Sequence, residues 1–270
     1  KPQTAKAESL SEIGIKEFKE PLLRRQIASG IAVGSYGVNL KMNAYAQERP
    51  AILLYYDKQV QSEDRQFPSL MTIADNTDHI FKDMPENAQR QHMERMSRML
   101  TMLHEYGHDI FPHKTDESVL TEAYKRFGGH EATIIDEIKA ENYYRALIPK
   151  MIEKSGLPGT KEQWGTGIVM ASLKMAHDMG AGDPYYYGAI YSLNRLFEEG
   201  VVTFSEGKIH INDFERLYGI CKENTQMLTD LHKNKNITAN KTKAWIKKNC
   251  TTSAEVAKAI TFVGKLMNSR

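Results

Sequence analysis

The residues with the clearest chemical meaning lie in the segment Leu103-His104-Glu105-Tyr106-Gly107-His108, which contains the pattern H-E-x-x-H. On a helix, residues four apart lie on the same face, so His104 and His108 can both point a ring nitrogen at one zinc ion. Glu105 then lies beside the open coordination position, where it can take a proton from zinc-bound water. The pattern predicts a zinc hydrolase with His104 and His108 as ligands and Glu105 as general base.

The surrounding sequence places this motif on a helix, as the chemistry requires. From Pro85 onward, apolar residues follow the three-and-four spacing of a buried helix face, at Met93, Met96, Leu100, Leu103, Gly107 and Ile110. Phe111-Pro112 is expected to end this helix. The setting favours a metal site over the alternative, a helix with two exposed or hydrogen-bonded histidines.

A catalytic zinc ion needs a third protein ligand. His113 lies too close to the motif to reach the same metal comfortably from the same helix. Phe111 stands where the longer motif with a distant third histidine has glycine. A carboxylate from a later helix is therefore the better candidate for the third ligand.

The best source of that carboxylate is the helix expected from about 131 to 148. Glu137 and Glu141 are four residues apart and share a partly apolar face, where buried carboxylates need partners. We assign Glu137 as the third ligand and Glu141 as acceptor for the free N–H of His104 or His108. Asp136 and Lys139 fall on other faces and are expected to be solvated. The alternative is a surface helix with ordinary carboxylates.

Both motifs resemble those of the dipeptidyl-peptidase III family of zinc peptidases, especially its shorter bacterial relatives. Members have a His-Glu pair, a second His, and a later helix of the form Glu-Glu-x-x-Ala-Glu or Glu-Glu-x-x-Ala-Asp. This chain has the related run Asp136-Glu137-Ile138-Lys139-Ala140-Glu141. The resemblance implies a metallopeptidase of the gluzincin class, with Glu137 as the third ligand. Met175-Ala176-His177 resembles the family's Ala-His element, which implies that His177 contacts the transition state.

The chain also departs from that family. Its first motif has the compact five-residue form, and the family's arginine shortly after the Ala-His element is missing. The loop through Gly182-Asp183-Pro184-Tyr185 resembles an insertion, and much of the usual N-terminal lobe is expected to be absent. These differences bear on dipeptidyl specificity rather than on the zinc. For the oxyanion donor, His177 is the first candidate and a tyrosine among residues 185–187 the second. Interhelical packing for His177, and core or rim packing for the tyrosines, are the alternatives.

Composition sets the broad class of the protein. The chain has 270 residues, of which 41% are hydrophobic and 26% charged, as in an ordinary soluble globular protein. A net charge of +2 gives no general drive toward nucleic acid. A solvated helical face is favoured over a nucleic-acid site for the basic run Lys233, Lys235, Lys241, Lys243, Lys247 and Lys248.

No apolar run is long enough to span a membrane. The start at Lys1 without Met is compatible with a processed or secreted form, and the compartment stays unknown.

The expected fold is mainly α (α+β), a helical zincin-like core with a few short strands and one β-hairpin. We expect a single catalytic domain over 1–270, with short strands within 1–84 and the helical zinc-binding part in 85–270. Strands are predicted at 31–38 and 51–56, and the hairpin at 201–211 with a turn of about three residues. Helices are predicted at 117–126, 131–148 (stopped by Pro149), 168–179, 185–199, 212–232 and 239–268.

The sequence thus predicts a zinc-dependent metallopeptidase that acts on a peptide or protein substrate and has no nucleic-acid partner. Two other functions stay open: a zinc hydrolase of non-peptide amides, and a non-catalytic binding protein with a structural zinc. Glu105 argues against the last, because a purely structural site needs no base beside the metal.

Overall fold

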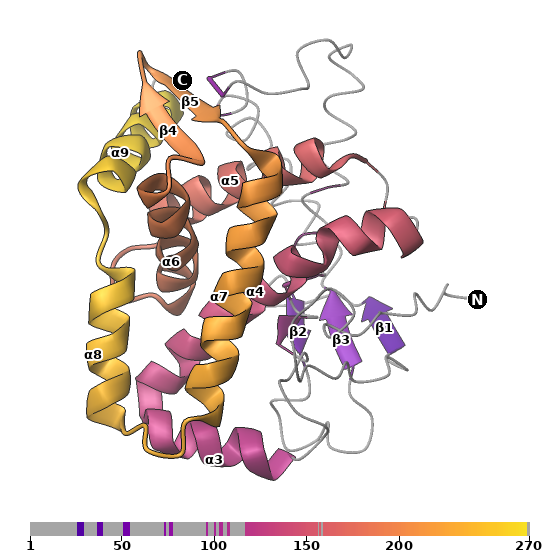
Figure 1. Ribbon diagram of the computed structural model, residues 1–270, viewed down its shortest axis with the longest axis vertical. Coiled ribbons are helices and arrows are strands. Elements are labelled where there is room, and N and C mark those ends of the chain that lie inside the picture. The colour runs from indigo at the N-terminus through magenta and orange to yellow at the C-terminus, as the bar shows by residue number, and fades with distance from the viewer. Residues whose placement is uncertain are drawn as a thin grey trace.

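A computed structural model describes the chain from 117 to 155, at 157 and from 159 to 268, together with three strands and several single positions nearer the N-terminus: 26–29, 37–39, 51–54, 73, 76, 77, 96, 100, 103, 104, 107 and 108. This part is mainly helical and contains one hairpin and one small sheet, which confirms the predicted fold class (Figure 1). The elements in chain order are β1 (Gln26–Ser29), β2 (Gly37–Asn39), β3 (Ala51–Leu54), α3 (Glu117–Phe127), α4 (Gly129–Ser155), α5 (Lys161–Asp178), α6 (Pro184–Glu198), β4 (Val202–Ser205), β5 (Lys208–Ile211), α7 (Phe214–Lys233), α8 (Ala239–Cys250) and α9 (Ala254–Asn268).

Helix α4 runs through the middle of the described structure. It packs against α6 and α7 and also contacts α3, α5 and α8. Every residue from 134 to 148 is buried, so this stretch has no solvent-facing side. The charged residues within it must therefore find partners inside the protein.

Two helix boundaries differ from the sequence prediction. Helix α4 continues through Pro149 to Ser155 instead of stopping before the proline. A proline costs a helix about 3 kcal/mol, a cost that the extensive packing of α4 offsets. Helix α5 begins at Lys161, earlier than predicted, because Thr160 and Gln163 form a capping box.

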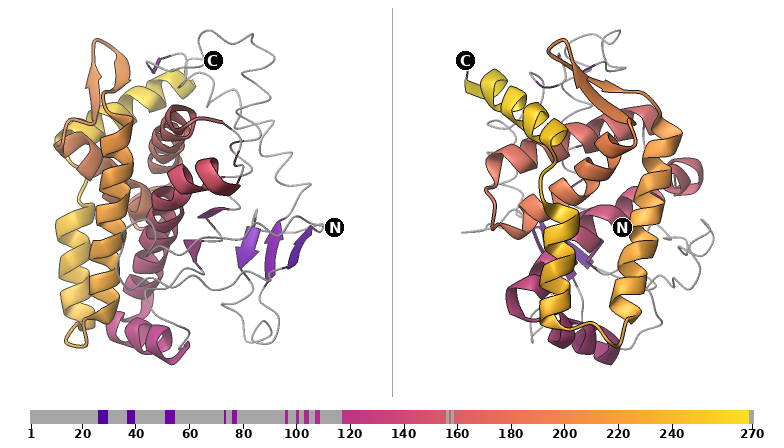
Figure 2. Two further views of the ribbon diagram at one scale, coloured as in Figure 1. Left: turned by 45° about the vertical axis from the view of Figure 1, so that its right-hand side comes forward. Right: turned by 60° about the vertical axis from the view of Figure 1, so that its left-hand side comes forward.

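The three short strands form a sheet in the order β1-β3-β2, with β1 parallel and β2 antiparallel to β3. In Figure 2 (left) this sheet lies on the side of α4 away from α7 and α8. Strands β4 and β5 form the predicted hairpin, but its turn contains only Glu206 and Gly207, because Ser205 pairs with Lys208. Both turn residues have positive φ, 52° and 72°, as a tight two-residue hairpin requires.

The C-terminal region is two helices, α8 and α9, where the sequence predicted one. The side chain of Asn194 on α6 holds the connection between them. Its Nδ2 donates to the carbonyl of Thr251 at 2.8 Å, and its Oδ1 accepts from the N–H of Ser253 at 3.1 Å. These tertiary hydrogen bonds satisfy backbone groups at the break, so the chain can turn there.

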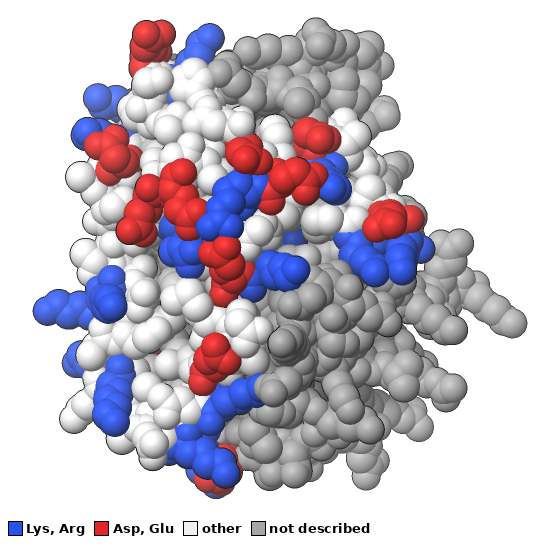
Figure 3. Space-filling model, in the orientation of Figure 1, with Lys and Arg blue, Asp and Glu red and all other residues white. Residues whose placement is uncertain are grey.

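The basic run of the sequence lies mainly on α8. Its four lysines are exposed, while Thr242, Ile246 and Cys250 face inward. In Figure 3, blue patches lie along the left edge, where Figure 1 shows α8. Around α7, in contrast, acidic and basic side chains pair: Arg216 contacts Glu199 and Glu223.

Two further features concern the cysteines and the membrane. Cys221 and Cys250 are both buried and unpaired, so they form no disulfide with each other. Within the described residues, each helix is too short or too polar to cross a bilayer.

Candidate metal centre

His104 and His108 lie one helical turn apart. The N–H of His108 donates to the carbonyl of His104 at 3.3 Å, the hydrogen bond of an α-helical turn. Gly107 brings this turn close to α4, because a Cβ there would lie 2.3 Å from the carbonyl oxygen of Ala140. Any larger residue would push the histidines away from α4. Glu105 and His113 lie outside the described residues, as does most of the predicted helix at 85–110.

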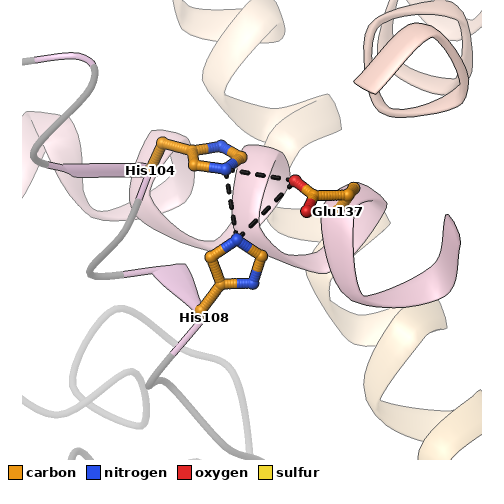
Figure 4. A group of neighbouring side chains, drawn as sticks. All are labelled: His104, His108 and Glu137. Atoms are coloured by element: carbon orange, nitrogen blue, oxygen red, sulfur yellow. Dashed lines mark hydrogen bonds and ion pairs between the residues drawn. The ribbon is translucent and has the colours of Figure 1, made fainter. Parts of the chain in front are cut away.

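Three side chains converge across this contact: His104, His108 and Glu137 (Figure 4). The two Nε2 atoms are 3.2 Å apart. Oε2 of Glu137 lies 3.1 Å from Nε2 of His104 and 3.6 Å from Nε2 of His108. All three ligand atoms therefore face one point between the helical turn and α4.

These atoms fit a zinc ion. Bonds of about 2.0–2.1 Å in a tetrahedron place neighbouring ligand atoms about 3.4 Å apart, close to the three distances found here. Oε2 of Glu137 is buried and makes no hydrogen bond within the described part of the chain. A buried carboxylate oxygen aimed at two imidazole nitrogens needs a positive charge between them. Two histidines and a glutamate are a common ligand set for catalytic zinc.

Glu141 orients His104. Its Oε1 lies 2.8 Å from Nδ1 of His104. Its other oxygen contacts the guanidinium of Arg145 and accepts from the hydroxyl of Tyr144 at 3.3 Å. We call His104, Glu141, Arg145 and Tyr144 the His104 relay. The structure thus places Glu141 beside His104, one of the two histidines named for it, and its supporting role stays a prediction.

Asp136 orients His108 in the same way, and here the sequence prediction was wrong. Asp136 and Lys139 were expected to be solvated, but they are 2% and 0% exposed. Oδ2 of Asp136 lies 2.8 Å from Nδ1 of His108. Its Oδ1 contacts Nζ of Lys139 at 2.8 Å and the hydroxyl of Tyr124 on α3. We call His108, Asp136, Lys139 and Tyr124 the His108 relay.

Electrostatics favour ionised carboxylates in both relays. Burial raises the pKa of Glu141, but Arg145, His104 and Tyr144 outweigh it and lower the pKa to about 2. Burial also raises the pKa of Asp136, but Lys139 and His108 hold it well below its usual range. An ionised carboxylate only accepts hydrogen bonds, so each Nδ1 must donate. An imidazole that is neutral, as a zinc ligand must be, then presents the Nε2 lone pair to the metal position.

His104 also lies in a strongly negative field. Burial lowers the pKa of His104, but the nearby carboxylates of Glu137 and Glu141 outweigh this effect. The net result is a pKa well above the usual value for histidine. A field that holds a proton this firmly also attracts a metal cation to the same place.

His177, the candidate oxyanion donor, lies half-buried in the last turn of α5. Its ring packs against α9, because a Cβ at Gly264 would lie 2.8 Å from its Cε1. Its catalytic role stays a prediction. The tyrosines named as second candidates lie in the first turn of α6, and only Tyr185 stacks near a ligand, with its ring centroid 5.6 Å from that of His104. Tyr186 instead bonds Thr252, with its hydroxyl 2.6 Å from Oγ1.

The sequence prediction missed five members of the relays: Asp136, Lys139, Tyr124, Tyr144 and Arg145. A signal for two ion pairs was present. Lys139 follows Asp136 by three residues and Arg145 follows Glu141 by four, the spacings at which opposite charges meet on one helix. Nothing in the sequence linked Tyr124 to the site, because it reaches Asp136 from another helix.

Comparison with known proteins shows similarity in fold. No family model and no curated protein matches the sequence. The structure of dipeptidyl-peptidase III from Corallococcus sp. strain EGB gives a TM-score of 0.63 at 13% identity, covering 89% of this chain and 45% of that chain. DPP III from Caldithrix abyssi gives 0.61 at 14% identity, covering 94% and 50%. The chain thus has a dipeptidyl-peptidase III-like fold and spans about half the length of these proteins.

Proposed function

We propose that this protein is a zinc-dependent metallopeptidase that hydrolyses peptide bonds in a peptide or protein substrate. One observation supports this most strongly. Nε2 of His104, Nε2 of His108 and Oε2 of Glu137 lie 3.1–3.6 Å apart, and a buried carboxylate orients each histidine. A site with this ligand set and both supporting carboxylates is built to hold a metal firmly.

The proposed roles follow from the donor set. His104, His108 and Glu137 would hold zinc, which when bound polarises a carbonyl and lowers the pKa of water. Glu105 follows His104 directly and would accept the proton of the attacking water. Glu141 and Asp136 keep Nε2 of each ligand deprotonated by accepting from Nδ1. His177 is the proposed donor to the oxyanion.

The decisive variant is Glu105→Gln. It should bind as much zinc as the unmodified protein, because Glu105 is not a ligand. Hydrolysis should fall about a hundredfold to ten-thousandfold, since the general base is lost. Glu153→Gln makes the same change at an exposed position of α4 and should leave both properties unchanged.

The measurement combines metal analysis with mass spectrometry of the products from a peptide mixture. Removal of dipeptides from the N-terminus would give the activity that the similar solved structures are named for, and internal cuts would indicate another cleavage mode. Undiminished hydrolysis by Glu105→Gln would exclude the mechanism. Zinc binding by the unmodified protein without any cleavage would favour a non-catalytic zinc-containing protein.

A further inference from the structure

The first turn of α6 is held in a defined position beside the metal centre. Asp183 caps this helix, accepting from the backbone N–H of Tyr185 at 2.9 Å, and Pro184 occupies the first turn. A proline at the start of a helix is pre-organised for it and loses no needed hydrogen bond. The backbone of Tyr185 is therefore anchored.

The register of α6 on α4 directs this turn toward the ligands. A Cβ at Gly188 would lie 3.3 Å from Cγ of Glu141 and 3.4 Å from the carbonyl oxygen of Glu137. One turn later, the hydroxyl of Ser192 donates to Oδ1 of Asn142 at 3.1 Å. Residues 185, 188 and 192 share one helix face. The face that carries Tyr185 is thus the face packed against the metal-binding turns of α4.

Tyr185 lies over His104 and still reaches the surface. Its ring is tilted by 39° to the imidazole, with centroids 5.6 Å apart, a close aromatic contact. Its residue is 38% exposed, whereas Tyr186 and Tyr187 are only partly exposed and pack against the core. Two of the three exposed large apolar residues in the described structure lie near each other in sequence: Met179 at the end of α5 and Tyr185 in the first turn of α6.

We propose that Tyr185 is a specificity-determining residue, whose ring forms an apolar wall of the substrate site beside His104. This inference rests on the proposed peptidase function. The wall would select peptides with a large apolar side chain, aromatic or aliphatic, next to the bond that is cut. The face of a phenol ring contacts such side chains favourably, and an aromatic pair gains about 0.5–1.5 kcal/mol beyond burial, equal to about a two- to tenfold preference.

The test uses short labelled peptides that differ at one position flanking the cleaved bond: Phe, Leu, Ala or Lys. Dissociation constants are measured on the zinc-loaded Glu105→Gln protein, which binds without cutting, alone and with Tyr185→Ala or Tyr185→Phe. Met227→Ala is the matched control, because Met227 is also 38% exposed but lies on α7. KM and kcat of the same changes in the active protein give a second readout.

With Tyr185→Ala, the dissociation constants of the Phe and Leu peptides should rise about two- to tenfold, and that of the Ala peptide should not change. In the active protein, the same change should raise KM more than it lowers kcat. Tyr185→Phe keeps the ring and should retain the preference for the Phe and Leu peptides over the Ala peptide, and Met227→Ala should match its parent. Equal weakening of all peptides, a preference for Lys, or a loss of kcat in Tyr185→Phe would overturn the proposal. Failure of the peptidase function is a separate result, namely no cleavage by the unmodified protein even though the binding series can be read.

Discussion

The carboxylates that support the two histidines of the metal centre are held by different partners. In the His104 relay, Glu141 is held by Arg145 and Tyr144, which lie on the same helix, α4. In the His108 relay, Asp136 is held by Lys139 of α4 and by Tyr124 of α3. One relay is thus built within a single helix, and the other needs a second helix.

The difference shows how α4 serves both histidines. Asp136 precedes Glu137 directly and contacts His108, whereas Glu141 follows Glu137 by one turn and contacts His104. Lys139 also donates to the carbonyl of His108 at 2.8 Å, which ties the histidine turn to α4. The His108 relay therefore positions the backbone of His108 as well as its side chain. The following predictions test two points. Loss of a ligand should affect zinc binding more than loss of a relay residue does, and the two relays should contribute differently to stability.

The largest effect should be the loss of zinc when the carboxylate ligand, Glu137, is replaced. Glu137→Gln keeps the size of the side chain but removes the charge aimed at the two Nε2 atoms. Zinc should be lost under dialysis conditions in which the unmodified protein keeps one equivalent, as it should in His104→Ala. Metal analysis is the measurement, and Glu153→Gln is the control. Unchanged zinc content in either variant would show that the ligands are wrongly assigned.

The next largest effect should be on folding stability, when the buried cation of one relay is removed. Arg145→Met leaves the carboxylate of Glu141 buried without its main counter-charge and should cost about 3–5 kcal/mol. Lys139→Met should cost less, about 1.5–3 kcal/mol, because the hydroxyl of Tyr124 contacts Asp136 more closely than that of Tyr144, at 3.3 Å, contacts Glu141.

Denaturant unfolding in the presence of a chelator gives both values without the contribution of zinc. Lys258→Met, which breaks an exposed ion pair with Glu255, is the control and should change little. Equal losses in Arg145→Met and Lys139→Met would remove the proposed difference between the relays.

Acid should weaken the His104 relay in a defined pH range. The pKa of Glu141 is about 2 in the folded protein, compared with an ordinary value of 4.5. The unfolded chain therefore binds the proton more readily, and the stability from Glu141 is complete above about pH 4.5 and lost as the pH falls toward 2. This difference in pKa corresponds to a contribution of roughly 3 kcal/mol to the free energy of unfolding. Unfolding measured across this range should be less pH-dependent in Glu141→Gln, and an unchanged slope would contradict the prediction.

The smallest of these effects should be on zinc affinity, when one carboxylate loses its charge. Glu141→Gln and Asp136→Asn should each weaken zinc about 10- to 100-fold, because an amide no longer fixes the histidine tautomer as firmly. Competition with a chelator of known affinity measures this. Wild-type affinity in Asp136→Asn would mean that only the His104 relay supports the metal.

Several features of the site followed directly from the sequence. The spacing of His104 and His108, and of Glu137 and Glu141, placed each pair on one helix face, and the structure brings these faces together. The hairpin and most helix positions also followed, since Gly128, Gly200 and Gly207 and the flanking apolar patterns are local signals. The break between α8 and α9 did not, because Asn194 on another helix holds it.

By itself, the sequence determined which side chains can share a helix face, because that depends only on the geometry of one helix. The tertiary structure alone decided which faces are buried. Asp136 was expected in solvent but is buried beside His108, because residues 134–148 of α4 are covered on all sides. In the same way, three consecutive tyrosines look equivalent in the sequence, but the packing of Gly188 against α4 places only Tyr185 at the metal centre. Burial depends on how separate helices pack, and no local pattern contains that information.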